Sequence, residues 1–250
     1  MRDAALQALQ AASRNATAAA QPAARLVIAG ATGTLGNEVL RRLVGLRLFQ
    51  DTQVLAREPI TAGLRSVGTT VVPGDDPSSW PAGAADTGLV MFDPPRLFYD
   101  RERALWTPLP QQLPALAAWM RRSGVRTLAI VLPHAQGRLP EALKRGLASL
   151  DEHEVARLGF ERLLLVRSAQ KPGEAQAAGP LPRLAHWMLS VFRYMVPSTE
   201  QPVRSAKVAE FVALALQLAP PGIHVAAPET VWRAAQEDVR EVVAHWLAGG

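Results

Sequence analysis

Three glycines at three-residue intervals, Gly30, Gly33 and Gly36, are the residues whose type and spacing most clearly predict chemistry. They follow the short apolar run 26–28, which is typical of a buried central strand in a parallel sheet. At such a turn the first glycine allows a sharp bend and the second lets backbone amides approach an anion. The third lets the next helix pack closely on the strand. Amides at a helix start stabilise negative charge, so the pattern predicts a cradle for a dinucleotide pyrophosphate.

The predicted cofactor contacts extend over the whole loop rather than its glycines alone. The loop consists of Gly30, Ala31, Thr32, Gly33, Thr34, Leu35 and Gly36. A mononucleotide phosphate loop is disfavoured, because no Gly-Lys-Ser/Thr follows the first glycine at the required spacing. In residues 37–46, apolar side chains recur at near-helical intervals opposite a polar face. Strand, glycine turn and amphipathic helix therefore occur in the order that dinucleotide binding requires.

The rest of the chain alternates predicted strands with predicted helices. Strands are predicted at residues 52–56, 69–72, 88–92, 126–132, 162–166 and 223–226, and helices at 111–122, 141–158, 181–196, 206–218 and 230–247. We expect Pro133 to end the fifth strand. This alternation predicts an α/β fold with a doubly wound parallel sheet, Rossmann-like in its order. Residues 93–110 would form a long loop at the carboxyl edge of the sheet, where ligands bind.

Composition limits the remaining possibilities. A chain of 250 residues accommodates one α/β domain, expected at 23–250, and the alanine-rich residues 1–22 would form a flexible extension. The absence of cysteine excludes disulfides and thiolate chemistry and suits a cytoplasmic protein. The net charge of +5 is scattered, so nucleic acid is not an expected partner. No apolar run reaches the roughly 18 residues of a transmembrane segment.

Several segments occur in the order found in one known superfamily. They are GATGTLG at 30–36, QVLAR at 53–57, VVPGDD at 71–76 and EVARLGFERLLLVRSA at 154–169. Through them, residues from about 24 to 235 resemble the atypical short-chain dehydrogenase/reductase superfamily, in particular its NAD(P)H-binding, NmrA-like and Tat-interacting-protein-like branches.

The resemblance implies a Rossmann domain that binds NADP(H), with Arg57 facing the adenosine 2′-phosphate and Gly74 and Asp75 near the adenine. NAD-specific sites place a carboxylate about twenty residues beyond the glycine loop, where this chain has Arg57. Glu58 beside it keeps NAD(H) as the second choice. By analogy with related folds, residues 175–250 would contribute a small substrate or lid region. A small-molecule substrate and a second copy of the chain are then the other possible partners.

The acid–base pair of the family's carbonyl reductases, a tyrosine with a lysine four residues later, is missing. The two tyrosines are Tyr99 and Tyr194, and four residues beyond them stand Arg103 and Ser198. Without the lysine, the usual proton transfer is unavailable. Two replacements are candidates for catalysis. His134 lies just beyond the fifth predicted strand and would exchange protons near neutral pH, and Tyr99 lies in the long loop with Arg103.

The acidic residues Asp151, Glu152 and Glu154 are expected to form a solvated helix face. A metal site is not predicted there, because no convergent histidine or second acidic cluster accompanies them, and His153 in the same stretch is expected to be a surface residue.

Two classes of function and a weaker third follow from these residues. The missing pair favours a catalytically degenerate NADP(H)-binding protein, acting as a redox sensor or as a structural or regulatory subunit. The alternative is an NADPH-dependent oxidoreductase or epimerase-like enzyme, with His134 or Tyr99 as a non-standard proton donor. In the third, the glycine loop is only a scaffold within an interaction protein.

Overall fold

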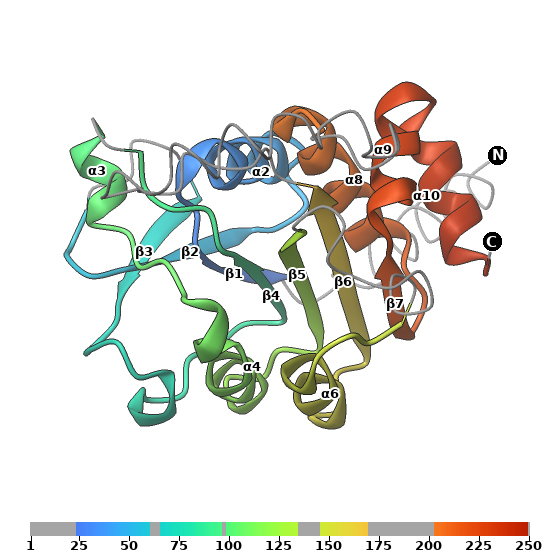
Figure 1. Ribbon diagram of the computed structural model, residues 1–250. Coiled ribbons are helices and arrows are strands. Elements are labelled where there is room, and N and C mark those ends of the chain that lie inside the picture. The colour runs from blue at the N-terminus through green and yellow to red at the C-terminus, as the bar shows by residue number, and fades with distance from the viewer. Residues whose placement is uncertain (1–23, 61–65, 97–98, 135–145, 170–202, 250) are drawn as a thin grey trace, which may run out of the picture.

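A seven-stranded sheet forms the centre of the fold in the computed structural model of this chain (Figure 1). The structure describes residues 24–60, 66–96, 99–134, 146–169 and 203–249. The strands are β1 (Arg25–Ala29), β2 (Asp51–Ala56), β3 (Val67–Val71), β4 (Thr87–Met91), β5 (Thr127–His134), β6 (Arg162–Ala169) and β7 (Gly222–Ala226). Their order is β3-β2-β1-β4-β5-β6-β7 and all neighbouring pairs are parallel. This confirms the predicted doubly wound α/β fold, in which the strand order reverses between the neighbouring strands β1 and β4. In such a fold the crevice lies at the carboxyl ends of these two strands.

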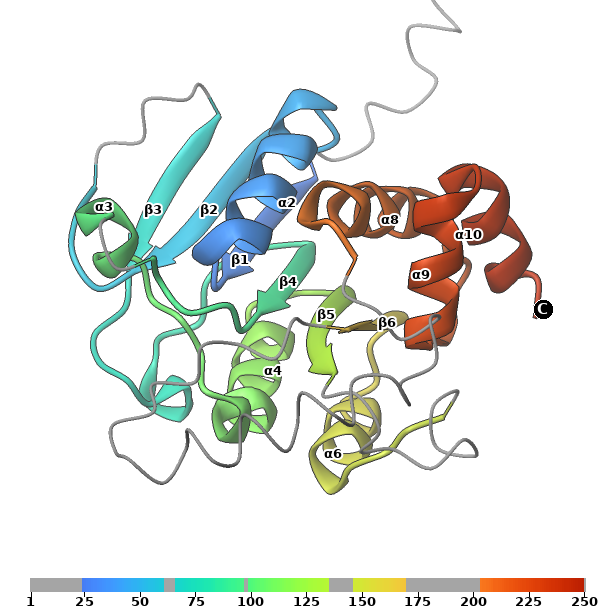
Figure 2. The same ribbon diagram turned by 45° about the horizontal axis from the view of Figure 1, so that its top comes forward.

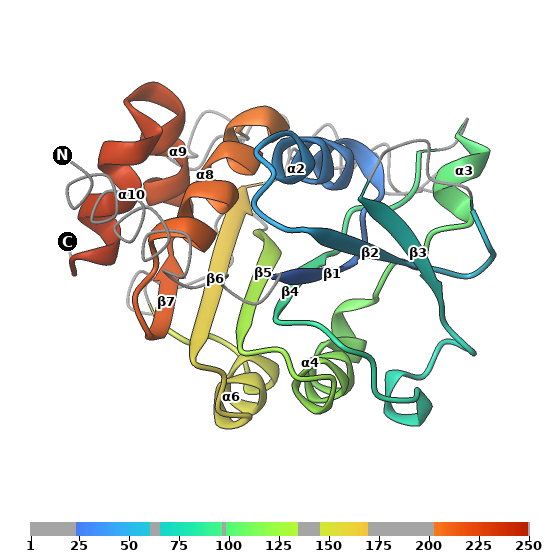
Figure 3. The same cartoon turned by 180° about the vertical axis from the view of Figure 1, so that it is seen from behind.

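Helices cover both faces of the sheet. The helices within the described residues are α2 (Gly33–Gly45), α3 (Asp100–Arg103), α4 (Leu113–Arg122), α6 (Leu150–Arg157), α8 (Ser205–Leu218), α9 (Pro228–Gln236) and α10 (Val239–Leu247). Helices α2, α8, α9 and α10 lie on one face and α4 and α6 on the other, as the front and rear views both show (Figures 1 and 3). No helix within the described ranges is long and apolar enough to cross a membrane.

The central strand β1 separates two apolar cores. Leu26 and Ile28 pack into the cluster under α2 and α8, whereas Val27 and Ala29 pack into the cluster under α4. All four side chains are buried, because helices cover both faces of the strand. This explains why β1 reads as a continuous apolar run rather than as an alternating one.

Two predicted helices have different bounds in the structure. The helix predicted at 141–158 starts only at Leu150, because the Ser149 side chain accepts a hydrogen bond from the Glu152 amide and caps it. Residues 141–145 lie outside the described part of the chain. The helix predicted at 230–247 is two helices, since Asp238 caps a new start at α10.

The prediction that Pro133 ends β5 is wrong. The strand continues to His134, and Pro133 lies opposite Ser168 of β6. On its other side β5 loses its neighbour earlier, since the last pair with β4 joins Met91 and Val131. Pro133 therefore stands where β5 is locally an edge strand, and a residue without an N–H group is tolerated there.

Some expectations fall on residues that are not described. These are the extension at 1–22, the helix at 181–196 and the part of the lid region at 175–202. The remaining part of that region, 203–249, supplies β7, the helix α8, which packs against α2, and the helices α9 and α10, which pack against α8.

Two glycines of α2 provide a matched test of this packing. A Cβ atom at Gly36 would lie 2.6 Å from the Ala31 carbonyl carbon and 2.7 Å from the Gly30 oxygen, whereas one at Gly45 meets nothing within 4 Å. We expect Gly36→Ala to lower the free energy of unfolding by about 1–3 kcal/mol. Gly45→Ala should raise it by up to about 1 kcal/mol. Urea denaturation measures both, and equal effects of the two changes would contradict this packing.

Candidate functional site

The glycine loop has the backbone geometry that the sequence predicts. Gly30 and Gly33 adopt positive φ angles of 80° and 68°, which favour glycine. The loop is buried except for the exposed Thr34. A Cβ atom at Gly33 would lie 2.8 Å from Asp93 Cβ and 3.0 Å from the Pro94 oxygen. The close neighbour for which this glycine makes room is therefore a segment of the same chain.

The carboxylate of Glu102 lies at the start of α2, where the pyrophosphate was predicted. The Gly33 amide donates to Glu102 Oε2 at 3.0 Å, and Asn37 Nδ2 donates to Oε1 at 2.8 Å. The backbone amide and guanidinium of Arg96 donate to the same carboxylate, the Nε atom at 2.7 Å. Glu102 is only 5% exposed. An internal anion thus takes the helix-terminal donor that a bound phosphate would need.

A second carboxylate, that of Asp93, lies against the same loop. The Leu35 amide donates to Asp93 Oδ2 at 3.2 Å. The Thr32 hydroxyl donates to the Asp93 backbone carbonyl at 2.5 Å and lies 3.0 Å from the Thr107 hydroxyl. Two amides of the first turn of α2, those of Gly33 and Leu35, are therefore bound to carboxylates from the segment after β4.

The two carboxyl groups have opposite pKa shifts. Burial raises the pKa of Glu102, but the hydrogen bonds from Arg96 and the Gly33 amide outweigh it, so this pKa lies below its ordinary value. Burial also raises the pKa of Asp93, and the hydrogen bond from the Leu35 amide offsets this only in part. The donors around Glu102 therefore favour its ionised form.

The chain segment after α3 adds to the carboxyl end of β2. The Arg57 amide donates to the Ala104 carbonyl at 2.7 Å, and the Trp106 amide donates to the Leu55 carbonyl at 2.9 Å. The Trp106 carbonyl accepts from the Gly30 amide at 3.2 Å. Trp106 therefore joins the ends of β1 and β2, on the adenosine side of the crevice. Figure 2 shows the preceding helix, α3, near the ends of β2 and β3.

The residues predicted to recognise adenosine are bound to one another and to this segment. Arg57 forms an ion pair of 2.8 Å with Asp75, and Asp75 accepts from Trp106 Nε1 at 3.1 Å. The hydrogen bond from Arg57 lowers the pKa of Asp75. The Gly74 carbonyl accepts from Trp80 Nε1 at 3.0 Å, and the Trp80 and Trp106 rings meet edge to face at 4.8 Å. Arg57, Gly74 and Asp75 are thus brought together, but around an internal tryptophan.

No described contact joins the two predicted proton donors, Tyr99 and His134. Tyr99 is 51% exposed, and the guanidinium of Arg96, rather than that of Arg103, stacks over its ring at 3.7 Å. His134 is the last residue of β5, and its side chain lies outside the described part of the chain. Their catalytic roles stay predictions.

The expectation that Asp151, Glu152 and Glu154 form a solvated face is wrong for Glu152. It is 5% exposed and pairs with Arg167 of β6, which is 2% exposed, at 2.7 Å. Arg167 also donates to the Gly146 carbonyl at 2.8 Å. Nothing in the local sequence distinguishes Glu152 from its acidic neighbours, because its partner lies fifteen residues later on another element. Among the described residues, no group of three His, Asp or Glu side chains suits a metal ion.

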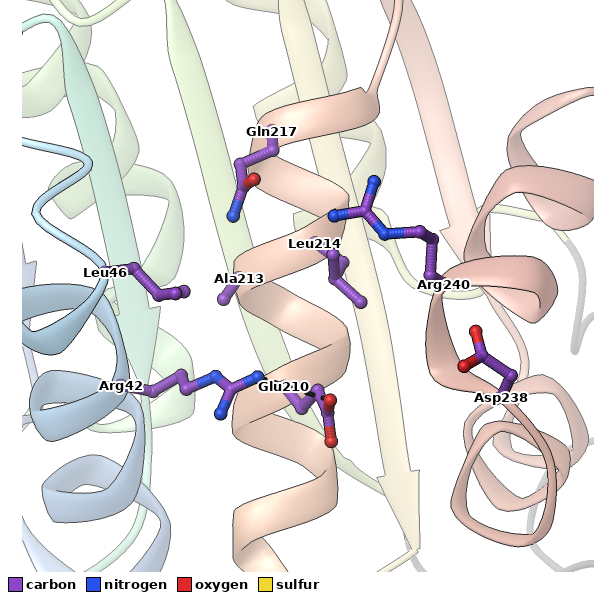
Figure 4. A pocket seen from close by; sticks show the side chains of 8 residues that line it. All are labelled: Arg42, Leu46, Glu210, Ala213, Leu214, Gln217, Asp238 and Arg240. Atoms are coloured by element: carbon purple, nitrogen blue, oxygen red, sulfur yellow. Dashed lines mark hydrogen bonds and ion pairs between the residues drawn. The ribbon is translucent and has the colours of Figure 1, made fainter.

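A surface pocket of about 240 Å³ lies away from the glycine loop. Arg42 and Leu46 near the end of α2, Glu210 and Gln217 of α8, and Arg240 of α10 help to line it (Figure 4). Arg42 pairs with Glu210 at 3.2 Å. Because α2 begins at the carboxyl edge of the sheet and ends here, this pocket is distinct from the predicted crevice.

A dinucleotide does not fit the loop in this arrangement. The pyrophosphate would have to share the Gly33 and Leu35 amides with two carboxylates, and the like charges would repel. The adenosine side holds Trp106, which is 0% exposed. The glycine loop is therefore closed by Glu102, Asp93 and Trp106, none of which the sequence singled out as a site residue.

No protein-family model matches the chain, and no curated protein matches it. One similar solved structure is the triphenylmethane reductase of Citrobacter sp. complexed with NADP(H), at 15% identity over 80% of this chain and 68% of that chain, with a TM-score of 0.49. Another is the Bordetella bronchiseptica enzyme WbmH in complex with NAD⁺, at 12% identity over 84% and 79% of the two chains, with a TM-score of 0.45.

A third is a Rossmann-fold NAD(P)-binding family protein from Shigella flexneri, at 15% identity over 78% of this chain and 87% of that chain, with a TM-score of 0.41. Similarity of this degree supports no conclusion about the ligand or activity of this chain. The fold assignment rests on the strand order itself.

The lowered pKa of Glu102 predicts a pH-dependent contribution to stability. Its ionised form stabilises the fold above the ordinary glutamate pKa of about 4.3, and this contribution is lost as the pH falls through the lower folded value. Near neutral pH, Glu102→Gln should lower the free energy of unfolding by about 1.5–3 kcal/mol. Urea denaturation should find a smaller difference from wild type at about pH 3 than at about pH 6.

The exposed Asp100→Asn in the same helix serves as the control for this comparison. A Glu102→Gln difference that stays constant with pH would contradict the assignment of the stabilising charge to Glu102.

The buried pair of Glu152 and Arg167 predicts a large loss of stability when one partner is removed. Glu152→Ala leaves the Arg167 guanidinium buried without this counter-charge, which costs about 3–5 kcal/mol in the free energy of unfolding. The matched change Glu154→Ala, at an exposed position of the same helix, should stay within about 0.5 kcal/mol of wild type. Equal midpoints of the two variants in urea denaturation would refute the role of the pair.

Proposed function

We propose that this chain is a non-catalytic Rossmann-fold protein, a degenerate member of the atypical short-chain dehydrogenase/reductase superfamily, and that it works as a regulatory or structural subunit. The observation that carries the proposal is the buried Glu102 carboxylate on the Gly33 amide. A dehydrogenase needs this donor for its cofactor, whereas here the chain binds it internally. The loop then stabilises the fold rather than a ligand.

The missing acid–base pair supports the same proposal. No tyrosine in the sequence has a lysine four residues later. Exposed Tyr99 stacks with Arg96, and this side chain in turn is held by Glu102. The alternative function, an NADPH-dependent oxidoreductase or epimerase-like enzyme with His134 or Tyr99 as the donor, finds no supporting contact among the described residues and is therefore an outcome of the test below.

Any binding of a dinucleotide requires Glu102, Asp93 and Trp106 to leave their places first. NADP(H) is our first candidate and NAD(H) the second, as the sequence resemblance implies, and a redox-sensing role would follow from such binding. The ion pair between Arg57 and Asp75 weakens the case for the 2′-phosphate, because Asp75 already neutralises Arg57.

Titration and turnover assays test this proposal. The closed loop lowers the fraction of protein molecules that are able to bind a nucleotide. Wild-type protein should therefore bind NADPH, NADH and NADP⁺ only weakly, without saturation at sub-millimolar concentration. It should not consume NADPH with aldehydes, ketones or quinones. Tryptophan quenching and nicotinamide absorbance report the two properties. NADPH consumption that His134→Ala or Tyr99→Phe abolishes would refute the proposal and establish the enzymatic alternative.

A further inference from the structure

Residues 99–108, which we call the plug segment, reach two parts of the crevice. Glu102 lies at the start of α2 and Trp106 between the ends of β1 and β2. In a dinucleotide-binding Rossmann domain, these are the pyrophosphate position and the adenosine side. The Trp106 indole packs against Trp80 and donates to Asp75, the residue predicted to lie near the adenine. The plug segment therefore brings a negative group to the predicted pyrophosphate position and an aromatic ring beside the predicted adenine position.

The donors around Glu102 are of the type that binds phosphate. They are the Gly33 amide at 3.0 Å, the Asn37 side-chain amide at 2.8 Å and the Arg96 guanidinium at 2.7 Å. Charge-assisted hydrogen bonds of this type are the strong ones, and the helix start adds positive potential. Without the Glu102 carboxylate, the same donors would converge on a position that favours an anion.

Glu102 also attaches α3 to the start of α2. It is the buried residue of this four-residue helix, whereas Asp100, Arg101 and Arg103 are exposed. A helix this short is not stable by itself. We therefore expect loss of the Glu102 carboxylate, which removes the hydrogen bonds from Gly33 and Asn37, to free α3 from α2, while Trp106 remains as the second attachment of the plug segment.

We propose that the plug segment is an autoinhibitory element, in which Glu102 and Trp106 compete with an anionic nucleotide for the glycine loop. The inference rests on the proposed function, because both require that the loop is closed in the wild-type protein. It adds that the closure is reversible and that Glu102 controls it. The closed and open forms then differ in nucleotide affinity by the strength of the Glu102 contacts.

Calorimetric titration with NADP⁺ tests the role of Glu102. Removing the Glu102 carboxylate, which competes with the nucleotide, raises the fraction of molecules whose loop is open. Glu102→Ala should therefore bind NADP⁺ at least about tenfold more tightly than wild type. Glu102→Gln keeps the shape of the side chain and should also raise the affinity for NADP⁺. It is the second variant to use if Glu102→Ala does not fold. Asp100→Ala, in the same short helix but exposed, should match wild type.

A reversible disulfide tests the role of the rest of the plug segment. Ala56 and Leu105 form an antiparallel bridge flanked by the two backbone bonds, so they are a non-hydrogen-bonded pair. The Cα atoms of such a pair lie about 4.5 Å apart, within the range for a disulfide. The chain has no cysteine of its own. Ala56→Cys with Leu105→Cys, added to Glu102→Ala, should abolish NADP⁺ binding when oxidised and restore it when reduced.

The outcomes separate this inference from the proposed function. Equal NADP⁺ affinities of wild type and both Glu102 variants, including no binding by any of them, would overturn the autoinhibitory role. Unchanged binding by the oxidised double-cysteine protein would overturn the role of Trp106 and the bridge. NADPH turnover by wild type would instead refute the proposed function, whatever the Glu102 variants bind.

Discussion

The contact between the Glu102 carboxylate and the Gly33 amide joins two parts of the chain that lie 69 positions apart. The first amides of a helix have no partner within the helix, and a buried helix start must find acceptors elsewhere. Here Glu102 and Asp93 provide them for α2. This requirement fixes the path of the chain after β4, since both carboxylates must return to the end of β1. The closure of the crevice follows from it.

The same physics would hold a bound phosphate, which is why a glycine loop alone does not define a function. A helix start with positive potential binds whichever anion is near, and an internal anion has the advantage of permanent proximity. Arg96 stabilises the charge of Glu102 and compensates for its burial. The loop thus keeps the backbone geometry of a nucleotide site while its donors bind the protein itself. Trp106 completes the closure by joining β1 to β2.

The features that depend on local pattern could be predicted from the sequence. The apolar run of β1 and the glycine spacing gave the strand, the turn and the start of α2, because each depends on neighbouring residues. The position of the long loop before α4, at the carboxyl edge of the sheet, also follows from local pattern, because the loop directly succeeds the apolar run of β4. Its short helix α3 was not predicted, since four residues carry no helical period.

The contacts that depend on distant partners could not be predicted. Glu102 stands among the charged residues of 100–103, and only the tertiary path turns it toward Gly33. Glu152 similarly became buried because Arg167 lies beneath it on β6. Pro133 stayed in its strand because β4 ends early, which is a property of the sheet rather than of the proline.

Amide hydrogen exchange at Gly33, followed by NMR in the ¹⁵N-labelled wild-type protein without added nucleotide, tests the closure of the loop most directly. If the Gly33 amide donates to Glu102, it exchanges slowly, and it exchanges faster in Glu102→Gln. A Gly33 amide that exchanges at the rate of an unprotected amide in wild type would contradict the account.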